Sequence, residues 1–435
     1  MTHEDVAAVL RGWYQTAIDA ADPARAVRDG VRAHEVTLGL HRDRPHWIIA
    51  LGKAAPAMAA AAVAHCEVTG RRIGGGLVVG AGESLPPHPA IAALAGDHPV
   101  PGARSARAAE ALGTLVSRVA RGDVVLVLVS GGTSSLIGAP VPGVRAEDLA
   151  ALHALLLGAG VPISRINAVR KRFSRWGAGR LAEALQGAHV LPVLLADVPN
   201  EDPAMIGSGP VSPDPLDARL VERLLREAGI AMQVPLSVAA ALGATRAGLL
   251  PETPKPGQPA FAQVAEPFVV GNAVALDAVA AAATEAGFGP VLLSRTPLQG
   301  DATAAGRVIA HAIARAPTGA VLAWGGETTV RLPPDHGLGG RCQQLALAAA
   351  EVLVELDVPT AWILAAGTDG RDGPAPAAGA IVSASSWRAS ADGGGVPRPS
   401  LRRCDAFAAL DAAGAILPAR ATGTNVMDIV VAVRA

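Results

Sequence analysis

The chain has 435 residues and a formal net charge of -1 at pH 7, and at about 100 to 200 residues per domain this length predicts two or three domains. Its near neutrality argues against a nucleic-acid partner, and no uncharged apolar run approaches the roughly 18 to 20 residues that a membrane span needs. The start of the chain lacks a basic region followed by an apolar core, so we expect a cytoplasmic protein.

The first predicted strand covers residues 46–51 and is followed by Gly52 and Lys53. The chain has three lysines, which leaves 34 arginines among its 37 basic residues (37 - 3 = 34), so a lysine at this place is notable. Residues 54–58 resemble a helix start, which puts Lys53 at the carboxyl end of a strand, where α/β sheets bind ligands. We predict that its ammonium group contacts phosphate. The alternative is a solvated lysine in a surface loop.

A proline-rich stretch, residues 83–102, follows the second predicted strand at 75–79 and is not expected to form regular structure. It contains Asp97 and His98. A rigid loop with such side chains is expected to line a substrate pocket, although an ordered surface connection fits the sequence equally well.

Residues 123–130 form an apolar run of β-branched and leucine residues that leads directly into two glycines and three hydroxyl residues. A run without polar alternation is typical of a central parallel strand that is buried on both faces. Glycines allow backbone N–H groups to approach an anion, and hydroxyls add donors. We therefore predict a phosphate-binding loop, with an ordinary strand-to-helix turn as the alternative, made of Ser130, Gly131, Gly132, Thr133, Ser134 and Ser135.

Two further features of the first half carry charge. The stretch 163–180 contains Arg170 and other basic residues without a nearby acidic block, so one or two of them are expected to face a carboxylate or phosphate. The predicted strand 190–197 ends in Asp197, which is placed to bind Mg²⁺ or to act as a general base, or else to cap the next turn.

Prolines cluster between residues 212 and 265, which marks the expected domain boundary. We predict one domain over 1–250 and another over 260–435. The strand and helix alternation of the first half indicates a doubly wound sheet. The second half repeats that alternation, with strands expected near 267–271, 291–294, 319–324, 361–366 and 427–433.

Polar loops follow the predicted strands of the second half. Gly325, Gly326 and Glu327 end one strand in a way that repeats the first half, so both halves are expected to face one cleft. Arg341 follows three glycines at a helix start, a pattern typical of an anion site. The loop with Asp369 and Asp372 superficially resembles a calcium loop but lacks its glutamate. Asn425 lies in a loop that can hold a ligand or simply turn.

The three cysteines are odd in number and far apart, which argues against a disulfide framework or a closed zinc site. Any metal is therefore expected to have oxygen ligands.

These motifs together resemble the class II glycerate 2-kinases, a family with an N-terminal glycerate-kinase domain and a C-terminal MOFRL-type domain. The resemblance covers nearly the whole chain and rests on many short motifs in the same order: residues 52–54, 96–99, 130–132, 167–171, 197–198, 208–210, 325–328, 339–341, 367–370 and 423–425.

The resemblance implies an α/β enzyme of two domains. The first would be a Rossmann-like, mostly parallel sheet with helices on both faces, and the second a smaller α/β domain, with the active site in the cleft between them. The implied reaction transfers the γ-phosphate of ATP to the 2-hydroxyl of D-glycerate with Mg²⁺.

In that scheme Lys53 and Arg341 are the essential cations, with Asp197 as a third catalytic residue, and the loop 130–135 and residues 325–327 bind nucleotide. His98, Arg170 and Asn425 would contact the substrate, while Asp197, Asp369 and Asp372 would bind the metal. A homodimer is also expected.

The chain departs from the family pattern in residues 172–179, at Asn200 and at Cys342. These departures leave open another small hydroxy acid or sugar acid as the acceptor. A hydroxypyruvate reductase is the second interpretation, although no dinucleotide fingerprint opens a helix. A sugar-acid sensor derived from a kinase is the third.

Overall fold

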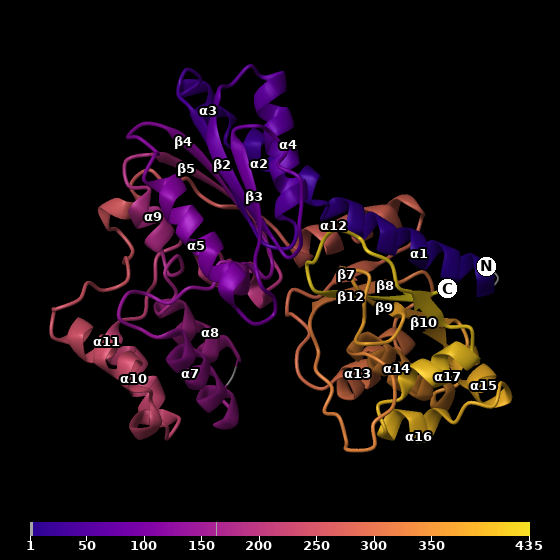
Figure 1. The fold of residues 1–435 in the computed structure, drawn as a ribbon. Helices are drawn as coiled ribbons and strands as arrows, with labels where there is room; N and C mark the ends of the chain where they lie inside the picture. The colour runs from indigo at the N-terminus through magenta and orange to yellow at the C-terminus, as the bar shows by residue number, and fades with distance from the viewer. Residues whose placement is uncertain (1–2, 162) are drawn as a thin grey trace. The chain divides into compact units, whose positions relative to one another are not determined.

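The computed structural model describes residues 3–161 and 163–435. By their internal contacts, these residues form two compact units (Figure 1). The N-terminal unit comprises residues 23–196 and 201–269, and the C-terminal unit comprises the chain up to Asp22, residues 197–200 and residues 270–435. In the described chain, no helix combines the length and the apolar character needed to cross a membrane.

The N-terminal unit is built on a six-stranded sheet with the order β3-β2-β1-β4-β5-β6. Its neighbouring strands from β3 to β5 are parallel. The strands are β1 (His46–Leu51), β2 (Ile73–Gly80), β3 (Ile91–Ala95), β4 (Val124–Val129), β5 (His189–Leu195) and β6 (Phe268–Val270). The order reverses direction between β1 and β4, and ligands of such sheets bind beyond the strands at this switch point.

The sequence predicted the centre of this sheet better than its edges. Strands β1 and β4 are buried along their whole length, as expected of continuous apolar runs in a central parallel strand. Strand β3 was not predicted, because this edge strand is short and partly exposed and so has no long apolar run. Strand β6 was assigned to the second half of the chain, but it belongs to the first sheet.

Helices surround this sheet and also form a separate group. Helices α7, α8, α10 and α11 enclose a small core of their own, which includes Leu152, Ile166, Phe173 and Leu225 (Figure 1). The helices of the unit are α2 (Pro23–Ala33), α3 (Glu35–Leu40), α4 (Ala55–Val68), α5 (Ala103–Val116), α6 (Thr133–Leu136), α7 (Ala146–Gly158), α8 (Ile163–Arg172), α9 (Arg180–Ala184), α10 (Ala218–Glu227) and α11 (Leu236–Arg246).

The C-terminal unit is built on a mixed sheet with the order β11-β10-β9-β12-β8-β7. The final strand β12 is inserted between β8 and β9 and is antiparallel to both. The sequence did not predict β10, which is rich in alanine and glycine and so has low strand propensity, or the three-residue β11. The strands are β7 (Val291–Leu293), β8 (Val321–Gly326), β9 (Ala361–Gly367), β10 (Ala377–Ser383), β11 (Ile416–Pro418) and β12 (Asp428–Arg434).

The first helix of the chain packs in the C-terminal unit, against α12. The Tyr14 hydroxyl donates a hydrogen bond of 2.7 Å to the Gly367 carbonyl, and Thr424 Oγ1 donates one of 2.6 Å to the Ala21 carbonyl. The helices of this unit are α1 (His3–Ala20), α12 (Asn272–Glu285), α13 (Ala302–Ala314), α14 (Arg341–Glu355), α15 (Ala384–Asp392), α16 (Pro397–Arg402) and α17 (Ala406–Ala412).

The expected α/β class is confirmed, whereas the compact units are not continuous in sequence. They differ from the expected ranges 1–250 and 260–435 because α1 joins the C-terminal unit and the proline-rich segment stays with the N-terminal unit. That segment is held by Lys255, whose ammonium group donates to the carbonyls of Asp214 and Leu216 at 3.1 and 2.5 Å. The expected ranges stay a prediction about which parts fold and function as domains.

Candidate functional site

The loops that follow β1 and β4 are joined at the switch point of the N-terminal sheet. Leu51 and Val129 pair at the ends of the two strands. Beyond them the Ser130 N–H donates to the Leu51 carbonyl, and the Lys53 N–H donates to the Gly131 carbonyl, both at 2.9 Å. Gly52 has a φ of 121°, and a Cβ atom there would lie 2.2 Å from Ser130 Oγ, so only glycine fits.

Lys53 and His98 both lie against Gly132, although they follow different strands. A Cβ atom on Gly132 would lie 3.3 Å from Lys53 Cγ and 3.2 Å from His98 Cδ2. Burial, and then the charge of Lys53, lower the pKa of His98. Lys53 itself is exposed, and no carboxylate in the described chain forms an ion pair with it. The structure therefore brings together three residues that the sequence singled out, with the ammonium group free to meet an anion.

The hydroxyls of the predicted phosphate loop hold the loop in shape. Thr133 Oγ1 donates to the Ser130 carbonyl at 2.8 Å, and Ser135 Oγ donates to the Gly132 carbonyl at 3.0 Å. Ser130 Oγ accepts from the Ala54 N–H at 3.1 Å, which ties the loop to the start of α4. Within the described residues, the backbone N–H groups of residues 131–134 donate no hydrogen bond. Most hydroxyls of the loop are thus used within the protein, whereas its backbone N–H groups are available to an anion.

Arg170 stands out from the basic stretch on α8. Its neighbours are engaged: Lys171 lies 3.3 Å from Asp214, and Arg172 pairs with Glu252. Arg170 is half-buried, burial lowers its pKa, and none of the described carboxylates pairs with it. A guanidinium group in this state can receive an anion.

The departures from the family pattern in this unit have structural explanations. Arg172 and Arg175 pair with the carboxylates of Glu252 and Glu110, and Trp176 Nε1 donates to the Ala109 carbonyl at 2.9 Å. These side chains thus hold the loop after α8 in place. Asn200 is a further departure, although it groups with residues 197–200 in the C-terminal unit. Its φ of 63° is a left-handed conformation, which asparagine tolerates better than most residues.

Asp197 follows β5 and groups with residues 197–200 in the C-terminal unit. Its predicted role as a base or metal ligand stays a prediction.

An acidic cluster surrounds Arg341 at one edge of the C-terminal sheet. Asp428, the first residue of β12, pairs with Gly326 at the end of β8 and with Gly367 at the end of β9. Arg341 donates from Nε and Nη2 to the two carboxylate oxygens of Asp428, at 2.5 and 2.9 Å. Arg341 Nη1 lies 3.0 Å from a carboxylate oxygen of Glu327. The expected anion clamp is therefore already bound to two carboxylates of its own chain.

Asp428 was missed in the sequence, although it is an acid at the head of an otherwise apolar strand. Its side chain is 5% exposed, against 45% for Glu327. Burial raises the pKa of Asp428, and the hydrogen bonds from Arg341 oppose this shift. Although burial alone would lower the pKa of Arg341, Asp428 and Glu327 hold it above its usual value. Asp428 is thus a buried anchor and Glu327 an exposed second partner.

Asp372 caps the helix that begins with Arg341. Its carboxylate oxygens accept hydrogen bonds from the N–H groups of Cys342 and Gln343, at 3.0 and 2.8 Å, and from Gln343 Nε2 at 2.9 Å. Burial raises the pKa of Asp372. Cys342 is fully buried beside it, and burial, Asp428 and Asp372 keep the thiol protonated by raising its pKa. Both oxygens of Asp372 are in use, so its role as a metal ligand stays a prediction.

The other predicted residues of this unit mainly shape their loops. Asp369 Oδ1 accepts from the Arg371 N–H, and Asn425 Oδ1 accepts from the Met427 N–H. A Cβ atom on Gly325 would lie 1.3 Å from Asn272 Oδ1, so packing alone requires glycine at that position. A Cβ atom on Gly326 would lie 2.4 Å from the Leu298 backbone. The nucleotide-binding and substrate-binding roles of these residues stay predictions.

Comparison with known proteins agrees with the resemblance found in the motifs. The family described as "Domain of unknown function (DUF4147)" matches residues 9–243, and the MOFRL family matches residues 320–428. The chain is 35% identical to a D-glycerate 2-kinase of Thermotoga maritima, with 95% of each chain covered. It is 33% identical to a glycerate 2-kinase of Pyrococcus horikoshii, with 96% of this chain and 94% of the relative covered.

A third relative has a different name. The chain is 35% identical to a putative hydroxypyruvate reductase of Agrobacterium vitis, with 99% of this chain and 95% of the relative covered.

Among solved structures, the crystal structure of a glycerate kinase from Thermotoga maritima matches with a TM-score of 0.84 and 33% identity. The match covers 99% of this chain and 100% of that one. The expected fold of two α/β domains, the second of MOFRL type, is confirmed. The chain therefore belongs to the class II glycerate 2-kinase family, in which a DUF4147 domain precedes a MOFRL domain.

Proposed function

We propose that the protein is a kinase that transfers the γ-phosphoryl group of ATP to the 2-hydroxyl of D-glycerate. The observation that carries this proposal is the unpaired Lys53 ammonium group beside Gly132, at the switch point of a parallel sheet. Phosphoryl transfer needs positioning and neutralisation of charge more than covalent chemistry, and a free cation beside unused backbone donors supplies both. The names of the Thermotoga and Pyrococcus relatives support the same reaction.

The two predicted cations, the loop after β4 and Asp197 each have a part in this scheme. The N–H groups of residues 131–134 hold phosphate oxygens, and Lys53 neutralises charge that shifts to the leaving phosphate in the transition state. Arg341, kept in one orientation by Asp428, presents its remaining N–H groups to a second oxygen. Asp197 serves as the base that takes the proton of the acceptor hydroxyl. The cleft between the two domains, which the resemblance implies, stays a prediction.

The acceptor is proposed to bind through its carboxylate. Arg170 lacks an acid partner among the described residues and can take that carboxylate in a bidentate manner. His98, with its pKa lowered by burial and Lys53, is expected to be neutral at pH 7 and to hydrogen-bond a hydroxyl. Asn425 is the third proposed contact. Another small hydroxy acid would satisfy the same groups, so the acceptor must be tested directly.

Mg²⁺ is proposed as the partner of ATP. The described part of the chain contains no cluster of three or more side chains able to enclose a metal ion. Mg²⁺ usually binds substrate phosphates and only one or two carboxylates, so its binding does not require such a cluster. Asp369 is the better placed of the second-half candidates, because Asp372 already uses both oxygens as a helix cap. When bound, Mg²⁺ would neutralise phosphate charge, and Asp197 is its other proposed ligand.

The reductase interpretation is supported by the names of two relatives, both putative hydroxypyruvate reductases of Agrobacterium vitis. The strand order β3-β2-β1-β4-β5-β6 is also that of dinucleotide-binding sheets. However, β1 is followed by Gly52, Lys53 and Ala54 instead of the three spaced glycines that such sheets use. We therefore keep reduction as an outcome of the test. A cytoplasmic location and a homodimer remain predictions.

The test is a direct comparison of activities on the purified full-length protein. ADP release with ATP and Mg²⁺ is measured over a panel of D-glycerate, L-glycerate and related hydroxy acids, and NADH oxidation is measured with hydroxypyruvate. We expect ADP release with D-glycerate, no NADH oxidation, and a product whose phosphate is placed on the 2-oxygen by NMR. Oxidation of NADH without ADP release would contradict the kinase proposal and favour a reductase. A higher rate of ADP release with another acid of the panel would show that glycerate is not the preferred acceptor.

A further inference from the structure

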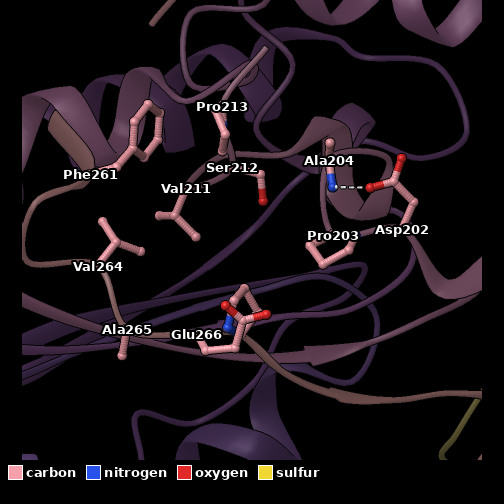
Figure 2. Close-up of a pocket in the computed structure, with 11 residues that line it drawn as sticks. Asp202, Pro203, Ala204, Val211, Ser212, Pro213, Phe261, Val264, Ala265 and Glu266 are labelled. Carbon is pink, nitrogen blue, oxygen red and sulfur yellow. Dashed lines mark hydrogen bonds between the residues drawn. The ribbon is translucent and has the colours of Figure 1, made fainter. Parts of the chain in front are cut away.

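The N-terminal unit contains a pocket of about 320 Å³ that none of the residues discussed above explains (Figure 2). One wall is the loop after β5, through Asp202, Ala204, Val211 and Ser212, and the other is the segment 261–267 that leads into β6. This volume lies at the lower end of the range for small-molecule sites, about 300 to 1,000 Å³.

The lining of the pocket selects the chemical class of its ligand. Val211, Phe261 and Val264 form an apolar side (Figure 2), while the charged residues among the described lining are the acids Asp202 and Glu266. A pocket with carboxylates and no lysine or arginine disfavours phosphate and carboxylate groups. It favours a flat, apolar body that carries hydrogen-bond donors.

Ser212 gives the pocket a polar group for hydrogen bonding. The residue is only 6% exposed, and its hydroxyl forms no hydrogen bond with another described residue. Figure 2 shows this hydroxyl directed into the pocket. Ser212 Oγ is not one of the fully buried polar atoms that lack a partner, so it is accessible from the pocket, where a bound ligand can form a hydrogen bond with it.

The same loop also contacts the predicted phosphate loop. Ser208 Oγ lies 2.6 Å from Ser134 Oγ, and a Cβ atom on Gly207 would lie 3.0 Å from Thr133 Cβ. Val211 follows Ser208 by three residues, so even a fully extended chain places the pocket wall within about 10 Å of that contact. A nucleoside triphosphate is long enough to span this distance.

We propose that this pocket holds the nucleoside part of ATP, with the triphosphate extending toward the loop 130–135. The base packs against Phe261 and the two valines. The Ser212 hydroxyl and the carboxylates accept hydrogen bonds from the amino group of the base and the hydroxyls of the ribose. This inference rests on the proposed function only in taking ATP as the phosphate donor. It is independent of the acceptor.

The experiment measures binding of adenosine and, separately, of inorganic triphosphate to the full-length protein by calorimetry. Ser212→Ala removes one hydroxyl and is expected to weaken adenosine binding about fivefold, the loss of one hydrogen bond. Ala265→Trp fills the pocket and should weaken it on the order of tenfold or more. Ala262→Trp, at an exposed neighbouring position outside the pocket lining, is the matched control and should change nothing.

Triphosphate binding should be the same in all variants, and the KM for ATP should rise in step with adenosine affinity while kcat stays within about twofold. Unchanged adenosine affinity in both Ser212→Ala and Ala265→Trp would overturn the inference. So would adenosine that binds in the pocket but is not displaced by ATP, because the site would then serve a separate nucleoside. If adenosine binding depends on the pocket but glycerate is not phosphorylated, the inference stands and the proposed acceptor fails.

Discussion

Lys53 is the residue on which the proposed chemistry depends most directly. Replacing it with methionine keeps the length of the side chain and removes the charge from phosphoryl oxygens. We expect kcat to fall on the order of 10² or more, as for the loss of one group that stabilises transition-state charge. The fold should be unaffected because the side chain is exposed. The measurement is ADP release, with thermal unfolding as the control for folding. A rate close to wild type would make Lys53 structural.

Arg341 and Asp428 are expected to act as one unit. Arg341→Lys removes the planar fork, and Asp428→Asn removes the charge that orients it, so each should lower kcat by about tenfold or more. The double variant should lose little beyond the worse single variant, because residues in one network are not additive. Glu327→Gln removes the exposed carboxylate from the same guanidinium group and should lower kcat less than Asp428→Asn. Additive losses of activity in the double variant would show that the two residues act independently.

At the scale of elements, the helix α14 depends on the carboxylate that caps its first turn. Asp372→Ala leaves the N–H groups of Cys342 and Gln343 without acceptors in a buried place, and we expect the free energy of unfolding to fall by about 1 to 3 kcal/mol. Asp301→Ala is the comparison, because Asp301 is the exposed N-cap residue of α13 and accepts one backbone hydrogen bond, from the Ala304 N–H. Its cost should be smaller in urea denaturation. Equal costs would show that burial of the cap does not matter.

At the scale of the whole molecule, the start of the chain supports the C-terminal unit. A chain that begins at Pro23 lacks the Tyr14 and Thr424 hydrogen bonds and the contact of Trp13 with Phe288, whose ring centroids lie 5.1 Å apart. We expect faster hydrogen exchange in β9 and β12 and a lower free energy of unfolding of that unit. Tyr14→Phe removes one hydroxyl and should cost about 1 kcal/mol. Hydrogen exchange at the wild-type rate in the shortened chain would show that α1 does not stabilise the C-terminal unit.

The two expected domains should not function when they are separated. Fragments 1–250 and 260–435 divide Lys53 from Arg341, and the second fragment also lacks α1. We expect neither fragment to phosphorylate an acceptor, as measured by ADP release. If the first fragment alone phosphorylated an acceptor, Arg341 and the Asp369 loop would have a structural role and no role in catalysis.

The sequence by itself determined the elements whose signal is local. Unbroken apolar runs predicted β1 and β4, and the glycines, hydroxyls and Lys53 after them predicted a ligand loop, because a central parallel strand must be apolar on both faces. The sequence indicated that one or two basic residues of the stretch 163–180 face an anion. It could not show that Arg170, rather than a neighbour, lacks an acid partner.

Only the tertiary structure decided what depends on partners far apart in the chain. Asp428 meets Arg341 because β12 is inserted between β8 and β9, a pairing across 87 positions that no local pattern reveals. The packing of α1 on the C-terminal unit and the pocket between the loop 202–213 and the segment 261–267 have the same origin. Periodicity reports which face of an element is buried, whereas the identity of the partner is set by topology.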